Sequence, residues 1–246
     1  HLNGVIPFNI GFSNISGDIV IIQNPECMHV GNLISHAVNN VNQSNYLTYS
    51  CFTTNSFQTN NKIKEMVKKN TYIDGIKKII KEDSGKYLIG WMGWYNHIKH
   101  NPCNLHFCSA ITKENLDKLR GFDELYSVGN WYDDDEFLER AKLICDVKLI
   151  EETMNPYVIH LFHKSSNIGS NDAGVGTGQH QIDNNPLIQK NKKLLQILKD
   201  KIKNGYNNPD WLEYHKDKVF DIFGKVYYKK SDKLFNIDYF NKLNII

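Results

Sequence analysis

Hydrophobic residues recur along the chain at two different spacings, and these predict a protein that mixes strands with helices. A nearly uninterrupted apolar run at residues 18–23 predicts a buried parallel strand, and Pro25 predicts a turn directly after it. Residues 91–97 are rich in aromatic side chains but irregular in pattern. Further strands, rich in β-branched and aromatic residues, are expected at 46–53, 105–111, 147–150 and 157–161.

Apolar residues three and four positions apart predict the helices. The longest is expected over 62–81 as an ordinary amphipathic helix, because lysines fill its outer face. Shorter helices are expected at 34–41, at 112–119 with Gly121 as terminator, and from 133–135 to 145. A last amphipathic helix, after Asn185-Pro186, is marked by Leu187, Leu194, Leu195, Leu198 and Ile202. The chain beyond it is expected to be a packed helical extension rather than a binding arm, and the whole pattern predicts the α/β class.

The composition narrows the classes of function. The chain has 246 residues and weighs 28.5 kDa, enough for one large domain or one medium domain with an appendage. Its 29 basic and 27 acidic residues give a net charge of +2, which provides no global field for nucleic acid. The longest aliphatic run, residues 19–22, is too short for a transmembrane segment. We therefore expect neither a nucleic-acid partner nor a membrane span.

The cysteines point to a reducing compartment. None of them forms a Cys-x-x-Cys pair, and their number is odd. We expect reduced, mostly buried thiols in a cytoplasmic protein, whose association with any membrane would run through a partner. The five residues are Cys27, Cys51, Cys103, Cys108 and Cys145.

Four consecutive carboxylates, at residues 133–136, form the strongest candidate for chemistry. Residues three apart share a helix face, so Asp133 faces the same way as Glu136, while Asp134 faces elsewhere. Crowded carboxylates raise one another's pKa, which suits a general base or a metal site. The alternative is a solvated helix cap, but such a cap has no need of Trp131 and Tyr132 directly upstream.

Two histidines end a predicted strand and form a second candidate. His160 and His163 are three residues apart, beside a Gly/Ser/Asn-rich stretch at 167–178 that we expect to be mobile. Both imidazoles can reach one divalent ion if the chain turns between them. A purely structural role for these histidines is the alternative.

Two weaker groups complete the candidates. Gln23, Asn24 and Glu26 follow a strand at the end where open α/β sheets bind ligands, although any buried strand must also end in polar residues. The aromatic segment offers faces on which sugar rings stack, but such segments also form protein cores. Its candidate residues are Trp94, Tyr95 and His97.

Together these segments resemble the GT-A glycosyltransferases, in particular the family 2 enzymes and the related β-1,4-galactosyltransferases and xylosylprotein galactosyltransferases. The resemblance spans residues 5–180, and the combination of motifs in this order carries it. The four stretches are residues 7–11 with 17–22, Gly-Phe-Asp-Glu at 121–124, Asp-Asp-Asp-Glu-Phe at 133–137 with Arg140, and the pair His160 and His163.

The resemblance implies roles for individual residues. Asp134 would be the general base that takes the proton from the acceptor hydroxyl, and Asp133 would hold the acceptor sugar. A divalent ion, Mn²⁺ or Mg²⁺, would be bound by His163 and His160, where it would neutralise the leaving diphosphate. Glu26 is a further candidate ligand from the chain itself, and the alternative is that the histidines alone hold the ion. Residues 165–178 would be a lid over the donor. Substrate contacts are expected from Asn9, Gln23, Asn24, Trp94, Tyr95, His97, Trp131, Tyr132 and Asp135.

The chain departs from the family pattern in two places. The Asp-x-Asp metal motif is replaced by residues 23–26, which leaves Glu26 as the carboxylate there. The family's N-terminal nucleotide-binding strands would precede residue 5, and the chain begins at His1 rather than Met, so we expect a piece of a longer protein or a site completed by another chain. The expected fold is a Rossmann-like GT-A mixed sheet flanked by helices at 1–185, followed by a helical C-terminal extension at 186–246.

The resemblance thus implies a metal-dependent hexosyltransferase of polysaccharide or glycan biosynthesis. It would transfer a sugar, with inversion, from a nucleotide-diphosphate sugar to a saccharide or glycoprotein acceptor. A non-catalytic saccharide-binding or degenerate glycosyltransferase module is the alternative. A metal-dependent phosphoester hydrolase is a third hypothesis, without a phosphate-binding loop to support it. No motif specifies the donor sugar, the nucleotide, the acceptor or the oligomeric state.

Overall fold

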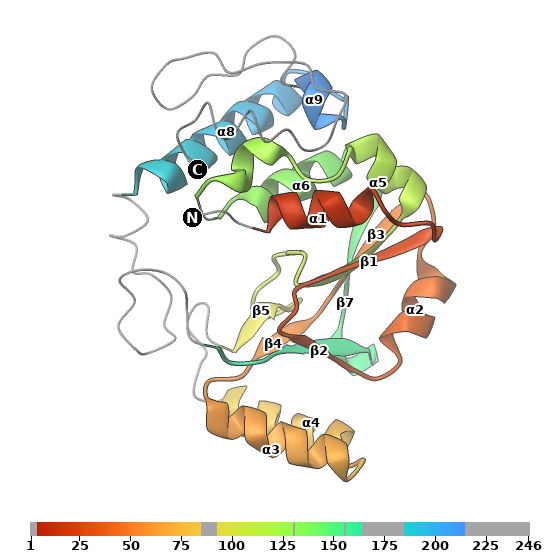
Figure 1. Ribbon diagram of the computed structural model, residues 1–246, viewed down its shortest axis with the longest axis vertical. Coiled ribbons are helices and arrows are strands. Elements are labelled where there is room, and N and C mark those ends of the chain that lie inside the picture. The colour runs from red at the N-terminus through yellow and green to blue at the C-terminus, as the bar shows by residue number, and fades with distance from the viewer. Residues whose placement is uncertain (1–3, 85–92, 130, 155, 164–184, 215–246) are drawn as a thin grey trace. The chain divides into compact units, whose positions relative to one another are not determined.

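The chain divides into two compact units in a computed structural model, and each unit is described here by itself. Unit 1 comprises residues 1–18, 113–144 and 182–246, and unit 2 comprises residues 19–112 and 145–181. The structure describes residues 4–84, 93–129, 131–154, 156–163 and 185–214 (Figure 1). Strands and helices are mixed, as the sequence predicts, and all strands of the described residues belong to unit 2.

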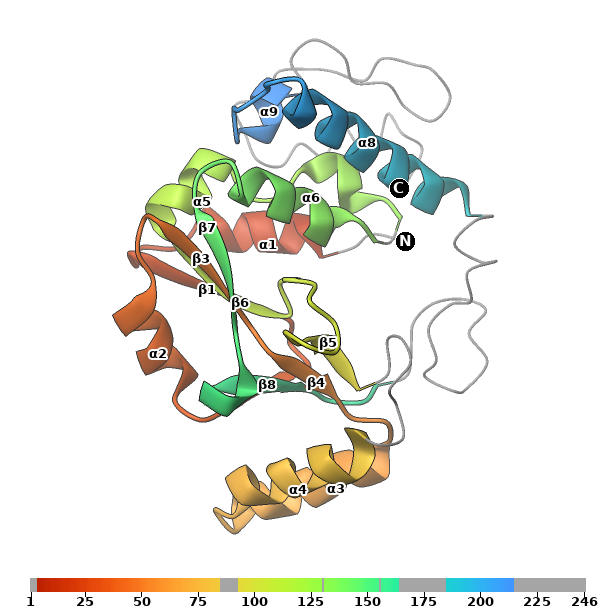
Figure 2. The same cartoon turned by 180° about the vertical axis from the view of Figure 1, so that it is seen from behind.

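Unit 2 contains two four-stranded mixed sheets. The first has the order β1 (Ile19–Gln23), β6 (Cys108–Thr112), β3 (Asn45–Tyr49) and β7 (Asp146–Ile150). The second has the order β2 (Cys27–Val30), β8 (Tyr157–His160), β4 (Cys51–Thr53) and β5 (Trp94–Asn96) (Figure 2). Among the strands that the structure describes, only the pairs β3–β7 and β4–β8 are parallel. Ser50 alone separates β3 from β4, so one extended stretch contributes to both sheets.

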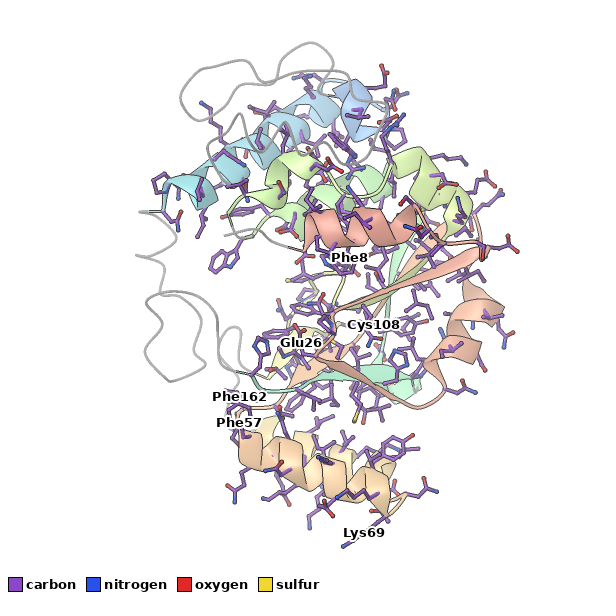
Figure 3. All side chains as sticks on the ribbon, viewed as in Figure 1. Phe8, Glu26, Phe57, Lys69, Cys108 and Phe162 are labelled. Atoms are coloured by element: carbon purple, nitrogen blue, oxygen red, sulfur yellow. The ribbon has the colours of Figure 1, made fainter. Side chains whose placement is uncertain are left out.

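The helices of unit 2 cover these sheets with apolar faces. Helix α2 (Leu33–Asn40) packs near β1, and a hairpin of α3 (Phe57–Lys68) and α4 (Tyr72–Ser84) packs on one face of the second sheet. Short helix η2 (Glu152–Met154) follows β7. The core under the hairpin includes Phe52, Ile63, Ile76, Trp94 and Ile159. The second core cluster includes Cys27, Cys51, Cys108, Leu47 and Val158, so three of the five thiols are buried as expected (Figure 3).

Unit 1 is helical over the residues that the structure describes. Its elements are α1 (Val5–Phe12), α5 (Lys113–Leu119), η1 (Glu124–Ser127), α6 (Asp133–Ala141), α8 (Pro186–Lys203) and α9 (Trp211–Tyr214). Asn185 begins α8 by accepting hydrogen bonds from the amides of Leu187 and Ile188, and Pro186 occupies the first turn, where a missing N–H is harmless. Helix α8 packs on α6 within this unit. None of the helices described here is both long and apolar enough to cross a bilayer.

Several predicted elements are confirmed. The helix predicted at 34–41 is α2, and the one predicted at 112–119 is α5, after which Gly121 adopts a left-handed φ of +66°. The predicted strands at 46–53, 105–111, 147–150 and 157–161 are observed as β3 with β4, β6, β7 and β8, with shifted ends. The predicted final amphipathic helix is α8.

Other predictions were wrong. The strand predicted as buried and parallel at 18–23 is β1, an edge strand that pairs antiparallel with β6 and buries alternate residues. The single helix predicted at 62–81 is two helices, because the chain reverses at Asn70, whose φ is +53°. The segment predicted as irregular contains β5, and the helix predicted to reach residue 145 ends at Ala141. Strand β2 was not anticipated.

The structure leaves four predictions without a test. The predicted lid at 165–178 and the chain beyond residue 214 lie outside the described residues. The single sheet expected of a GT-A fold corresponds to two sheets here, so the class is α/β and the finer fold stays a prediction. The predicted boundary at residue 185 also stays a prediction.

Candidate functional site

Strand pairing brings Glu26 and His160 together although 134 residues separate them. Strand β2 pairs antiparallel with β8, and this register sets Cys27 opposite His160. The residue before β2 therefore lies beside the residue after β8, and the amide of Leu161 donates to the carbonyl of Glu26 at 3.0 Å. Both side chains are thus delivered to one end of the second sheet, within unit 2 (Figure 3 labels Glu26).

Glu26, His160 and His163 form a compact group, here called the His/Glu cluster. Glu26 Oε1 lies 3.1 Å from His160 Nε2 and 3.9 Å from His163 Nε2, and the three potential ligand atoms lie within 4.8 Å of one another. The hydrogen bond from His160 lowers the pKa of Glu26, which keeps the carboxylate ionised. His160 is buried and His163 is exposed, so the cluster opens to solvent on one side.

The donor set fits a divalent ion. Two imidazole nitrogens and one carboxylate oxygen converge from two strand ends, which is a common ligand set for transition metals. Mg²⁺ prefers oxygen ligands, so Mn²⁺ fits this set better than Mg²⁺. His160 Nδ1 is buried without a hydrogen-bond partner among the described residues, which leaves the Nε2 side as the interacting edge of the ring. The chemistry of the donors agrees with the predicted ligands.

Aromatic rings enclose His160. Tyr95 meets the imidazole edge-on with ring centroids 4.9 Å apart, and Phe107 stacks on Tyr95 at 4.6 Å and also approaches His160. Tyr95 therefore lies beside the His/Glu cluster, and its expected contact with substrate stays a prediction. The sequence did not identify Phe107 as a site residue, because an aromatic residue at the start of a predicted strand is more often part of the core.

The other predicted contacts of unit 2 have partners within the protein. Gln23 donates to the carbonyl of Cys27 at 2.7 Å and contacts His29, and Asn24 lies 3.5 Å from Glu26 Oε1. These two amides therefore shape the turn that carries Glu26. A direct contact with substrate stays a prediction for both.

Trp94 and His97 are buried, which favours the core alternative that the sequence left open. Trp94 packs on Phe52 with ring centroids 5.1 Å apart. His97 Nδ1 accepts from the amides of Lys99 and His100 at 2.9 and 3.0 Å, and its Nε2 lies 3.1 Å from Glu152. Burial lowers the pKa of His97, and the neighbouring carboxylate partly offsets this. The His97 ring thus stabilises the loop that follows β5 by hydrogen bonds to its backbone.

The predicted acid run begins α6 in unit 1, after a strained turn. Gly129, Trp131 and Tyr132 have φ values of +96°, +75° and +71°, a left-handed region that side-chain-bearing residues rarely adopt. Glu136 points into the core, where it pairs with Arg140, so it does not join the other carboxylates. The remaining candidates are Asp133, Asp134 and Asp135, which are only partly buried.

Burial raises the pKa of two of these three carboxyl groups. It raises the pKa of Asp133 to about 6, and the neighbouring charge of Asp135 adds to the effect. Burial also raises the pKa of Asp135, which the charge of Lys199 partly offsets. Carboxyl groups with raised pKa values suit proton transfer near neutral pH, although structural groups can show the same shift.

Asn9 and the Gly-Phe-Asp-Glu segment form a structural unit. The carboxamide of Asn9 donates to the carbonyl of Phe122 and accepts from its amide, both at 2.9 Å, and it also donates to Glu124. Asp123 accepts from the amide of Leu125 and so begins η1. Asn9 is buried, and its predicted substrate contact is untested.

Comparisons with known proteins add no further information, because no family model, curated protein or solved structure matches the chain.

Proposed function

We propose that this protein is an inverting, metal-dependent glycosyltransferase that uses a nucleotide-diphosphate sugar as donor and a saccharide or glycoconjugate as acceptor. The observation that carries the proposal is the His/Glu cluster. Its three ligand atoms come from two segments far apart in the sequence and yet lie within 4.8 Å of one another. The resemblance to GT-A enzymes implies the two histidines as ligands, and the pairing of β2 with β8 brings Glu26 beside them.

The acid run supplies the second part of the proposal. Asp134 acts as the general base and takes the proton from the acceptor hydroxyl as that oxygen attacks the anomeric carbon. Asp133 accepts hydrogen bonds from the acceptor sugar, and its raised pKa, about 6, leaves it mostly ionised at pH 7. Trp131 and Tyr132 contribute aromatic faces next to these acids, which suits the apolar face of a sugar ring.

His160, His163 and Glu26 would hold the divalent ion, which supplies Lewis-acid stabilisation of the negative charge on the leaving diphosphate. Glu26 remains ionised because its pKa is lowered, and Tyr95 with Phe107 restricts the orientation of the His160 ring. Neighbouring residues thus keep Glu26 ionised and fix the orientation of the His160 ring.

The test is transfer from a panel of UDP-, GDP- and dTDP-sugars, with Mn²⁺ and with EDTA. Asp134→Asn should lower turnover by about 10² to 10⁴-fold, because it removes a general base. His163→Ala should raise the Mn²⁺ concentration needed for half-maximal activity. Asp117→Asn and His100→Ala are matched controls, since Asp117 is an exposed acid on α5 and His100 is an exposed histidine outside the cluster.

The outcomes separate the three hypotheses. Transfer that requires both Mn²⁺ and Asp134 supports the proposal and names the sugar. Glycan binding that survives EDTA and Asp134→Asn, with no transfer from any donor, would favour a saccharide-binding module. Release of phosphate from simple phosphoesters without sugar transfer would favour the hydrolase.

A further inference from the structure

Two neighbouring residues of α8 contact the strained turn before α6. Lys190 Nζ donates to the carbonyl of Leu125 at 2.6 Å and to that of Val128 at 3.3 Å. Asn191 Nδ2 donates to the carbonyl of Trp131 at 3.1 Å. The helix thus binds the backbone on both sides of Gly129, and all of these residues belong to unit 1.

Gly129 also lies in close contact with the first turn of α8. A Cβ placed on Gly129 would lie 2.9 Å from the Cβ of Leu187 and 3.2 Å from its carbonyl, so the first turn of α8 touches the backbone of the turn directly. The φ of Gly129 is +96°, which only glycine adopts without strain. The turn and the helix are therefore fitted to each other at a position that excludes any side chain.

The turn needs such external support. Trp131 and Tyr132 both have a left-handed backbone, which is unfavourable for residues with side chains and persists only where the surrounding structure fixes it. Tyr132 also precedes α6 without making a side-chain capping hydrogen bond. Local sequence preferences therefore do not stabilise the conformation that precedes Asp133.

The contact also uses groups that are unfavourable to bury. Asn191 is fully buried, and burial lowers the pKa of Lys190 to about 8, against a favourable charge from Asp123. A lysine in such surroundings costs free energy unless it is hydrogen-bonded, and here its ammonium group is bonded to two carbonyls. Simple apolar packing of α8 needs neither residue, since Leu194, Leu195 and Leu198 already bury its apolar face.

We propose that α8 clamps the backbone at residues 128–129 and 131–132, here called the turn, with Lys190 and Asn191 as positioning residues that hold Asp133 and Asp134 in place for sugar transfer. This inference rests on the proposed function for its catalytic meaning. The clamp itself concerns only the stability of the turn's backbone, which hydrogen exchange measures without any reference to sugar transfer. It gives the helix after residue 185 a role that the sequence pattern does not reveal.

The test compares Lys190→Met with Lys193→Met, which removes an exposed lysine from the same helix. Hydrogen exchange of the amides of residues 128–136 should become at least about tenfold faster in Lys190→Met and stay unchanged in Lys193→Met. The kcat for transfer should fall by about 10- to 100-fold with little change in KM, because misplaced catalytic groups slow the reaction more than they weaken binding. Asn191→Ser is the second variant if Lys190→Met does not fold.

A measurement on the native chain needs no variant. Protection factors, corrected for intrinsic exchange, should rise in residues 128–136 as the pH rises above about 8, because the pKa of Lys190 is lower in the closed turn than in water, so that loss of its proton favours the closed turn over the opened one. Asp123 is the carboxylate whose charge acts on this ammonium group.

The results distinguish the two proposals. Faster exchange of the turn with no transfer from the native protein supports the clamp and overturns the proposed function. Normal exchange in Lys190→Met and in Asn191→Ser overturns the clamp, whatever the activity. A uniform increase of exchange over the whole of unit 1 would also overturn it, since that result indicates general destabilisation.

Discussion

At the scale of single residues, the buried pair of Glu136 and Arg140 fixes the frame around the acid run. Arg140 donates to both oxygens of Glu136, at 2.5 and 2.8 Å, and to the carbonyls of Leu119 and Gly121 at 2.6 and 3.0 Å. The guanidinium group is completely buried, so nearly all of its hydrogen bonds must be made within the protein. Both residues match motif positions of the glycosyltransferase resemblance, but their contacts are structural.

Removal of this carboxylate should therefore destabilise the protein severely. Glu136→Gln leaves the buried Arg140 charge without the carboxylate to which it donates two hydrogen bonds, and we expect the free energy of unfolding to fall by about 3–5 kcal/mol. Glu139→Gln breaks the more exposed pair with Lys142 on the same helix and should cost less than about 1 kcal/mol. Urea denaturation of both variants measures the difference. Equal losses in the two variants would contradict the structural role.

At the scale of elements, the sequence predicts those helices and strands whose capping residues and apolar spacing all lie within the element's own segment. The helix α8 carries its own cap, its proline and its apolar spacing, and it is predicted nearly to the residue. Strand β2 is only four residues long, and two of its residues are partly exposed, so its pairing with β8 and not its pattern makes it a strand.

The candidate site could likewise be predicted only where its residues are close in the sequence. Two histidines three apart are visible in the sequence, whereas Phe107 is brought to them only by strand pairing.

The turn between α3 and α4 shows why one helix was expected where two exist. Apolar residues continue at helical spacing on both sides of Asn70, so the pattern hides the reversal. The φ of Asn70 is +53°, and asparagine is one of the few residues that tolerate this conformation. The residue at this position, rather than the hydrophobic pattern, determines the turn.

Substitution at Asn70 should test this account. Asn70→Ala places a residue that disfavours the left-handed region there and should lower the free energy of unfolding by about 1 kcal/mol. Asn70→Gly removes the same side chain but adopts this φ freely, so it should leave stability nearly unchanged. Thermal unfolding of the two variants gives the comparison. A larger loss in the glycine variant would indicate that the side chain, and not the backbone conformation, stabilises the turn.

At the scale of the whole molecule, the predicted chemistry is divided between two units built from interleaved segments. The acid run and the Gly-Phe-Asp-Glu segment belong to unit 1, and the His/Glu cluster belongs to unit 2. Unit 1 collects residues from the beginning, middle and end of the chain. Contacts of high sequence separation therefore hold it together, and sequence patterns, which are local, do not reveal such a division.

This organisation predicts that the chain cannot be cut at residue 185 without loss. Helix α8 buries Ile188, Leu194, Leu195 and Leu198, and full burial of such a side chain contributes about 1.5–3 kcal/mol. The sum approaches the entire stability of a typical domain, about 5–15 kcal/mol. A fragment of residues 1–185 should therefore show rapid proteolysis and fast hydrogen exchange in residues 113–144.

A fragment of residues 1–214 is the matched control, because it keeps α8 and α9 with every contact described for them. Its exchange in residues 113–144 should stay close to that of the full chain. If instead residues 1–185 remain as protected as residues 1–214, the boundary predicted from the sequence is a true domain boundary, and α8 is an appendage to a unit that is stable without it. Because α8 also carries Lys190 and Asn191, that result would leave the clamp without an energetic basis, and the two measurements therefore test each other.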